Sequence, residues 1–145
     1  MKKIIIPFLI GNLLSFSPHA FAETFQSSHK CLADNLYHEA RGEGERGMKY
    51  VGHVTLNRVK SKRYPNTVCG VVYQRNQFSW TRNKPAIKEK KAYSRARAIA
   101  RALLKRDESK THFFGATYFH ATHVRPTWAS SKKVVMRHGN HVFLR

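Results

Sequence analysis

The spacing of apolar residues predicts three helices followed by a short strand-like tail. Residues 48–59 place apolar or small side chains at the three- and four-residue intervals of a helix with one buried face: Met48, Val51, Gly52, Thr55, Leu56 and Val59. The same spacing predicts a short helix over 31–41 and a longer one over 85–105. The segments 116–119 and 142–144 are strand-like and aromatic. The expected fold class is therefore mainly α (α+β), one domain with a small late β element.

The segments between these elements are short and rich in turn-forming residues. Glycines follow the first helix at positions 42, 44 and 47, and 61–70 contains a Pro-Asn pair that favours a turn. Residues 71–80 have a short, mixed pattern. Residues 23–30 resemble a loose leader, so we expect the domain itself to span 31–145.

The first 22 residues have the layout of a secretory signal peptide. Lys2 and Lys3 precede a mostly apolar run over 4–16, and Ala20-Phe21-Ala22 offers the small residues of a cleavage site. An uncleaved anchor is the alternative, but the apolar run is short for a helix that spans a bilayer. We therefore expect an exported protein with no stable membrane span after cleavage.

Export changes the interpretation of the two cysteines, Cys31 and Cys69. An exported chain meets an oxidising compartment, and we therefore expect a disulfide between them. Two free buried thiols are the alternative. The chain has neither a CxxC pair nor the four cysteines of a zinc site.

The chain is strongly basic, with 27 Lys and Arg against eight Asp and Glu and a net charge of +19. Basic residues cover the face of the 85–105 helix that lies opposite its apolar positions. This face is a solvated surface, a surface attracted to anionic polymers of the cell envelope, or a nucleic-acid-binding surface. Export argues against nucleic acid as the main partner, and the helix lacks a recognition motif with interleaved aromatic residues.

Three of the eight acidic residues, Glu39, Glu43 and Glu45, lie close together in the sequence. On a helical wheel, Glu39 lies beside Leu32 at the edge of the apolar face of the first helix, whereas Asp34 points toward water. Partial burial would raise the pKa of Glu39 into the range that a general acid needs near neutral pH. The alternative is a carboxylate at the core margin that turns outward or pairs with an arginine.

Glu43 follows Glu39 by one helical turn, or projects from a loop if Gly42 ends the helix. Two carboxylates on one face do not straddle a glycosidic bond as paired glycosidase acids do. A single acid, assisted by a group of the substrate, fits this arrangement better.

Five stretches of the chain are informative when taken together. They are 36–43 (LYHEARGE), 54–59 (VTLNRV), 77–80 (QFSW), 115–121 (GATYFHA) and 139–143 (GNHVF). In this order they resemble the SleB-type cell wall hydrolase family, which includes spore cortex-lytic enzymes. The resemblance covers the chain from about Cys31 to Arg145, and several strings in order are more specific than any one.

The resemblance implies a lysozyme-like, mainly helical domain that cleaves peptidoglycan between N-acetylmuramic acid and N-acetylglucosamine, without a metal or a cofactor. It implies that Glu39 is the catalytic acid and that Glu43, the second glutamate of the motif, supports catalysis. The implied product is a 1,6-anhydro sugar, because the muramic acid 6-hydroxyl closes on C1. A muramidase that delivers water is a variant of the same class. A cationic envelope- or nucleic-acid-binding protein without catalysis is the alternative from a different class.

We also expect a difference from the spore enzymes, namely the absence of a separate peptidoglycan-binding domain ahead of the catalytic part. The spore-cortex substrate is therefore not carried over. The short exported form resembles the versions found in Gram-negative bacteria. We expect a monomer that acts on ordinary peptidoglycan in the periplasm or outside the cell.

Residues in two of these stretches are candidates for binding the glycan strand. Gln77, Phe78 and Trp80 offer flat apolar area and polar groups that suit sugar rings, although Phe78 taken alone fits a core position better. Tyr118 and His120 share one side of a strand. They either point into the groove or form an ordinary polar strand face.

Further candidates are Trp128, as a hinge or groove aromatic, and Asn57 beside Arg58 on the 48–59 helix. Asn57 binds a sugar or the catalytic loop, or makes a structural contact. The nine histidines raise the question of zinc, but the HExxH motif is absent because position 42 is Gly. His120 and His123 lack a third ligand at a fixed spacing. We therefore expect no metal site.

Overall fold

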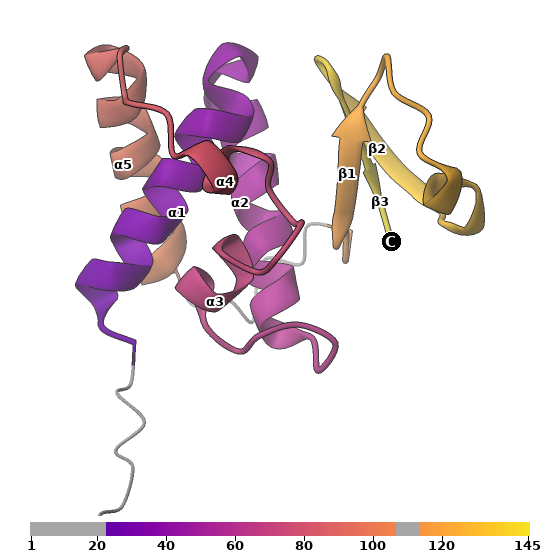
Figure 1. Cartoon of the computed structure of the whole chain (residues 1–145), viewed down its shortest axis with the longest axis horizontal. Helices are drawn as coiled ribbons and strands as arrows, with labels where there is room; N and C mark the ends of the chain where they lie inside the picture. Colours follow the sequence, from indigo (N-terminus) through magenta and orange to yellow (C-terminus); the bar gives the residue numbers. More distant parts are fainter. Residues whose placement is uncertain (1–22, 107–113) are drawn as a thin grey trace, which may run out of the picture.

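Three long helices stand side by side and carry a small sheet on one flank (Figure 1). The computed structural model describes residues 23–106 and 114–145. The predicted signal peptide over 1–22 lies outside the described residues. Within the described part, every helix is too short or too polar to cross a bilayer.

The core lies where α1 (Phe25–Ala40), α2 (Gly44–Lys60) and α5 (Lys90–Lys105) meet. Each helix buries the apolar side that its sequence spacing predicts, because burial removes that surface from water. Fully buried side chains from these helices include Leu32, Leu36, Met48, Val51, Val54, Ala96 and Ala100. The mainly helical class and the helix over 48–59 are thus confirmed. A 3-10 turn, η1 (Arg41–Glu43), joins α1 to α2.

The first helix begins earlier than the sequence pattern predicts. Thr24 is its N-cap, and the Thr24 hydroxyl accepts a hydrogen bond from the backbone N of Ser27 at 3.1 Å. The prediction of a loose leader over 23–30 is therefore wrong. A capping residue before a weakly apolar turn is the signal that was missed.

The third long helix begins five residues later than predicted, at Lys90 instead of Pro85. The backbone N–H groups of Lys88 and Glu89 both donate to the hydroxyl of Tyr37, each at 3.1 Å. These donors hold the segment against α1. Two short helices, α3 (Val68–Val72) and α4 (Trp80–Asn83), occupy the part of the chain before it.

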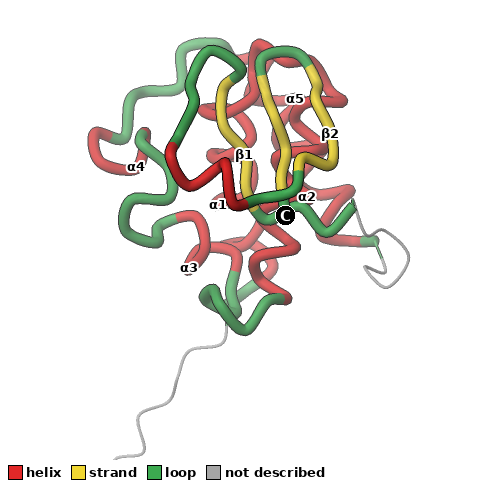
Figure 2. Tube along the Cα trace, turned by 90° about the vertical axis from the view of Figure 1, so that its right-hand side faces the viewer, coloured by secondary structure: helices red, strands yellow, loops and turns green. Residues whose placement is uncertain are grey.

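The late β element is an antiparallel sheet of three strands in the order β1-β3-β2. β1 (Tyr118–Ala121) and β3 (His141–Leu144) correspond to the two predicted strand-like segments, and Phe119 lies opposite Phe143. β2 (Val134–His138) was not predicted, because a register shift between Val134 and Met136 breaks its alternation. Figure 2 looks onto the strands, with the helices behind them.

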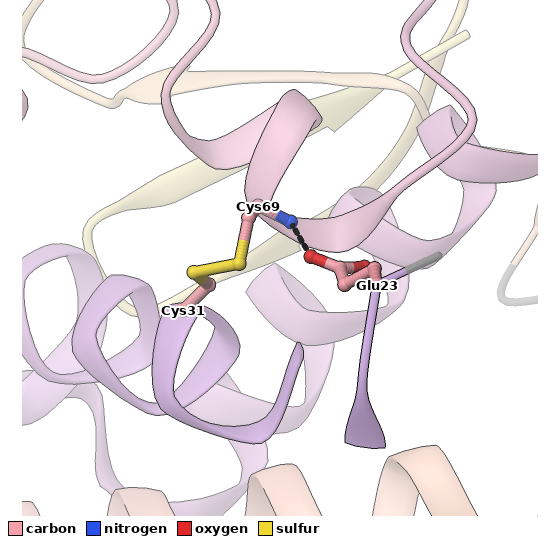
Figure 3. A group of neighbouring side chains, drawn as sticks. All are labelled: Glu23, Cys31 and Cys69. Atoms are coloured by element: carbon pink, nitrogen blue, oxygen red, sulfur yellow. Dashed lines mark hydrogen bonds between the residues drawn. A yellow bond between two sulfur atoms is a disulfide. The ribbon is translucent and has the colours of Figure 1, made fainter. Parts of the chain in front are cut away.

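A disulfide and a carboxylate lie together where α1 meets α3 (Figure 3). The expected disulfide between Cys31 and Cys69 is present and joins α1 to α3. The carboxylate of Glu23 accepts hydrogen bonds from the backbone N of Val68 at 2.8 Å and of Cys69 at 2.7 Å. Glu23 and the two sulfur atoms lie within 4.8 Å of one another, but their ligand atoms are already used by these bonds.

Candidate active site

Glu39 lies in the last turn of α1, between the buried residues Leu36 and Ala40. Within the described residues its carboxyl makes no hydrogen bond and no ion pair. Burial raises the pKa of Glu39 from its usual 4.5 to about 7, although the positive charge of Arg58 opposes the shift. A carboxylic acid in this state can give up a proton near neutral pH and take one back.

Arg58, on α2, is the cation that acts on Glu39, and its residue is only 5% exposed. Its Nε donates to the carbonyl of Thr117 at 2.7 Å, and its guanidinium lies 5.3 Å from the centre of the Phe78 ring. Its Nη1 is buried without a hydrogen-bond partner among the described residues. Burial lowers the pKa of Arg58, while nearby Tyr64, Tyr118 and Glu39 raise it.

Glu43 has a different environment, because both of its oxygens are hydrogen-bonded. Its carboxylate accepts from the backbone N and the side-chain Nδ2 of Asn140, each at 3.0 Å, across 97 positions of sequence. A Cβ at Gly139, whose φ is +51°, would overlap Glu43 Oε2. Partial burial raises the pKa of Glu43, but the bonds from Asn140 and the nearby His141 and His138 lower it overall. Glu43 therefore joins η1 to the turn between β2 and β3 in its ionised form.

Phe78 is a core residue and not a surface for sugar. It is 2% exposed, and its ring packs against Arg58 and, at 6.3 Å between ring centres, against Phe119. The prediction that Phe78 contacts the glycan strand is therefore wrong, and the alternative of a core position holds, because Arg58 of α2 and Phe119 of the sheet cover the ring. Gln77, beside it in the chain, is half-buried.

Trp80 is half-buried at the start of α4 and held firmly. Its Nε1 donates to Asn35 Oδ1 at 3.0 Å, and its ring stacks on His38 with 4.6 Å between centroids. Asn35 in turn donates to Thr55 Oγ1 at 3.3 Å. These contacts fix the orientation of the Trp80 ring, which stacks on His38, the residue before Glu39 on α1.

Tyr118 and His120 lie on the same side of β1, as the alternation predicts. Both contact the ring of Trp128, at 5.6 and 5.8 Å between centroids. Trp128, in the 3-10 turn η3 (Thr127–Ser131), is 41% exposed. Phe119 points to the other side and packs on Phe143. The three polar aromatic side chains thus form one partly exposed group.

Two further expectations are settled by contacts between distant segments. Asp34 does not point toward water: it is 5% exposed and accepts hydrogen bonds from Lys30 at 2.6 Å and from the Tyr93 hydroxyl at 2.8 Å. The helical wheel placed Asp34 in water because it cannot show that α5 covers this face of α1. Asn57 has a structural contact, since its Nδ2 donates to the carbonyl of Ala116 at 2.9 Å.

The structure has a hollow between α1 and residues 84–89 that we did not predict from the sequence. One part has a volume of about 310 Å³ and is lined by residues that include Tyr37, Arg41 and Trp80. Another part, of about 250 Å³, is lined by residues that include Tyr73 and Trp80. The segment 84–89 shows only mixed polarity in the sequence, and no local pattern indicates that it faces α1.

The profile of the family described as Cell Wall Hydrolase matches residues 42–144. The matched segment begins after Glu39. Among curated proteins, the spore cortex-lytic enzyme of Halalkalibacterium halodurans is 33% identical over 118 residues, which are 77% of this chain and 33% of that protein. The spore cortex-lytic enzyme of Bacillus subtilis is 29% identical over 119 residues, 79% of this chain and 36% of that protein. The chain thus spans about a third of the length of these relatives.

Two solved structures have a similar fold. The catalytic domain of the germination-specific lytic transglycosylase SleB from Bacillus anthracis aligns with a TM-score of 0.67 at 24% identity, over 89% of this chain and all of that domain. The catalytic domain of the Bacillus cereus SleB protein aligns with a TM-score of 0.65 at 24% identity, over 93% of this chain. At this level of identity the likeness describes the fold.

Proposed function

Because this chain belongs to the cell wall hydrolase family, we propose that it is an exported glycosidase that cleaves peptidoglycan between N-acetylmuramic acid and N-acetylglucosamine. The observation that carries the proposal is the state of Glu39, a desolvated carboxyl with a pKa of about 7 and no hydrogen-bond partner among the described residues. A structural carboxylate is normally paired or solvated, as Glu43 and Asp34 are here. An unpaired acid that keeps a substantial protonated fraction near neutral pH is available to a substrate.

In the first step, Glu39 gives its proton to the glycosidic oxygen that leaves as the 4-hydroxyl of N-acetylglucosamine. The bond between that oxygen and C1 of N-acetylmuramic acid breaks, and positive charge develops at C1 and the ring oxygen. Glu39 becomes a carboxylate close to this charge. The nearby cation of Arg58 favours the ionised form that Glu39 now has.

In the second step, the Glu39 carboxylate takes the proton of the muramic acid 6-hydroxyl, and that oxygen bonds to C1. The product is a 1,6-anhydro sugar, and Glu39 is protonated again for the next cycle. One carboxyl is sufficient, because the nucleophile belongs to the substrate. In the muramidase variant the same proton transfer activates water instead, and the product has a reducing end.

Glu43 acts as a positioning residue in this proposal. Its two hydrogen bonds to Asn140 hold the turn of the β2–β3 hairpin against the start of α2. Burial raises the pKa of Glu43, but the hydrogen bonds from Asn140 lower it by more. Glu43 therefore stays ionised at a pH at which Glu39 is protonated. The two carboxyls therefore have separate roles.

The glycan strand binds along the partly exposed aromatic residues near this acid. Trp80 and Gln77 offer contacts on the helical side, and Tyr118, His120 and Trp128 on the sheet. Aromatic faces match the apolar faces of sugar rings, and their polar atoms orient the hydroxyl groups. No metal or cofactor enters the reaction that we propose.

The proposal places the enzyme as a monomer outside the cytoplasm. The signal-peptide layout of residues 1–22 supports export, as does the Cys31–Cys69 disulfide, since disulfides persist in oxidising compartments. The names of the curated relatives refer to the spore cortex, a layer outside the cytoplasm. The basic side of α5 would attract anionic envelope polymers and speed encounter at low salt.

Mass spectrometry of purified peptidoglycan after digestion tests the proposal. The proteins to compare are the mature wild type, Glu39→Gln, and Glu45→Gln as a matched control. Glu45 is exposed on α2, where its carboxylate lies 3.8 Å from Lys49. We expect anhydromuropeptides from the wild type and the control only, because a general acid contributes about 10² to 10⁴-fold in rate.

Other products would change the conclusion in defined ways. Reducing-end products from the wild type alone would retain Glu39 and assign water as the acceptor. Equal activity of Glu39→Gln and the wild type would exclude Glu39 as the acid. No product from folded wild type would favour the cationic binding protein without catalysis.

A further inference from the structure

The two parts of the hollow between α1 and residues 84–89 share an aromatic pair in their lining. His38 and Trp80 line both of its parts, of about 310 and 250 Å³, as do Pro85 and Ala86. The first part extends to Arg41, Lys88 and Glu89, and the second to Lys30, Tyr73 and Lys84. An extended chain could therefore lie along it, in contact with flat rings and small apolar side chains.

The walls of this hollow are held in place before any ligand arrives. The Trp80 ring is fixed by its bond to Asn35 at 3.0 Å. The segment 84–89 is fixed at both ends: Lys84 N donates to the carbonyl of Trp80 at 2.8 Å, and two backbone N–H groups donate to the Tyr37 hydroxyl. A preformed site loses little conformational freedom on binding, which favours affinity.

The hollow carries an excess of positive charge. Its two acidic residues are both engaged, Asp34 with Lys30 at 2.6 Å and Glu89 with Arg41 at 2.8 Å. Two lysines, Lys84 and Lys88, have no acidic partner among the described residues. The ammonium of Lys84 lies 5.6 Å from the centre of the Tyr73 ring. Two lysines without acidic partners, beside rings and small apolar groups, suit a ligand that combines carboxylates with small apolar parts.

The hollow also adjoins the surroundings of Glu39. His38 and Arg41, which line its first part, lie on either side of Glu39 in the sequence. Glu39 itself does not line the hollow, so a polymer cleaved at Glu39 would place a substituent there, and not its glycosidic bond.

We propose that this hollow binds the stem peptide carried by the glycan strand that Glu39 cleaves. Stem peptides combine the methyl groups of alanine with free carboxylates, which match the small apolar wall and the two lysines. The inference rests on the proposed function, because it takes the substrate to be peptidoglycan. It adds that the enzyme distinguishes peptide-bearing strands from bare glycan.

Binding can be measured separately from catalysis. The chain has two tryptophans, so Glu39→Gln combined with Trp128→Phe leaves Trp80 as the fluorescent reporter inside the hollow. We expect a saturable change in its emission with a disaccharide that bears a stem peptide. The peptide-free disaccharide should bind about tenfold more weakly, as expected for two exposed charge contacts. Equal affinity for the two disaccharides would overturn the inference.

Charge reversal in the hollow supplies the matched comparison. Lys84→Glu with Lys88→Glu should abolish the preference for the peptide-bearing disaccharide. Lys90→Glu with Lys91→Glu makes the same change of charge on exposed lysines at the start of α5, which do not line the hollow. That control should keep the preference. Equal losses in both double variants would show a general charge effect and overturn the inference.

Cleavage assays separate failure of the inference from failure of the proposed function. On intact peptidoglycan, Lys84→Glu with Lys88→Glu should raise KM, and on glycan stripped of peptides by an amidase it should leave KM unchanged. A wild type that cleaves both substrates equally well, with equal disaccharide affinities, would retain the function and overturn the stem-peptide site. A wild type that cleaves neither would contradict the function, while the fluorescence titration would still report on the hollow.

Discussion

The buried acid should make the folded protein less stable as pH rises, and Glu39→Gln should remove that penalty. In the unfolded chain this carboxyl ionises near its usual pKa of 4.5, whereas burial keeps it protonated up to about 7 in the folded state. Between these values unfolding releases a proton, so a rise in pH favours the unfolded chain. The contribution is fully present below pH 4.5 and is lost as pH rises through 7.

The magnitude follows from the difference between the two pKa values. Each unit corresponds to about 1.4 kcal/mol, so Glu39 ionisation costs about 3 kcal/mol of stability at pH 8. Glutamine has nearly the same shape as a protonated glutamate and does not titrate. Glu39→Gln should therefore match the wild type at pH 4 and exceed it by about 3 kcal/mol at pH 8.

Urea unfolding of both proteins at pH 4 and pH 8, with the disulfide intact, measures this difference. All other titrating groups are common to the two proteins, and their contributions cancel when the free energies of unfolding are subtracted. A stability difference that is the same at both pH values would refute the reasoning, because it would mean that Glu39 ionises equally easily in both states. A smaller gain at pH 8 would indicate that water reaches the carboxyl.

Three other outcomes are expected. Activity on labelled peptidoglycan should fall about tenfold per pH unit above pH 7, because only protonated Glu39 starts the reaction; a rate that stays level to pH 9 would contradict this. Replacing Cys31 and Cys69 by alanine should lower the free energy of unfolding in urea by about 4 kcal/mol, the value for a loop of 38 residues; a loss below about 1 kcal/mol would show that the loop is ordered in the unfolded chain. Asn140→Ala should cost about 1 kcal/mol in the same assay, since it removes one hydrogen bond to the ionised Glu43; unchanged stability would mean that water replaces that bond.

Residue spacing was sufficient for much of the fold and for the burial of Glu39. The helix over 48–59, the mainly helical class and the two apolar strand segments follow from periodicity, because a helix or strand must bury one side whatever covers it. The position of Glu39 beside apolar residues follows from the same wheel. The disulfide was predicted from two cysteines and a segment with the layout of a signal peptide.

Other features depend on which distant segment covers each surface, and local spacing carries no such information. Asp34 belongs to the core because Tyr93 of α5 covers it, although the wheel places it in water. Phe78 is buried by Arg58 and Phe119, and Glu43 is held by Asn140, 97 positions away. The hollow beside Trp80 likewise exists only because residues 84–89 are tied to Tyr37. The helices and the position of Glu39 beside apolar residues thus follow from local residue spacing. The neighbours that set the pKa of Glu39 and of Glu43, and the walls of the hollow, come from long-range packing.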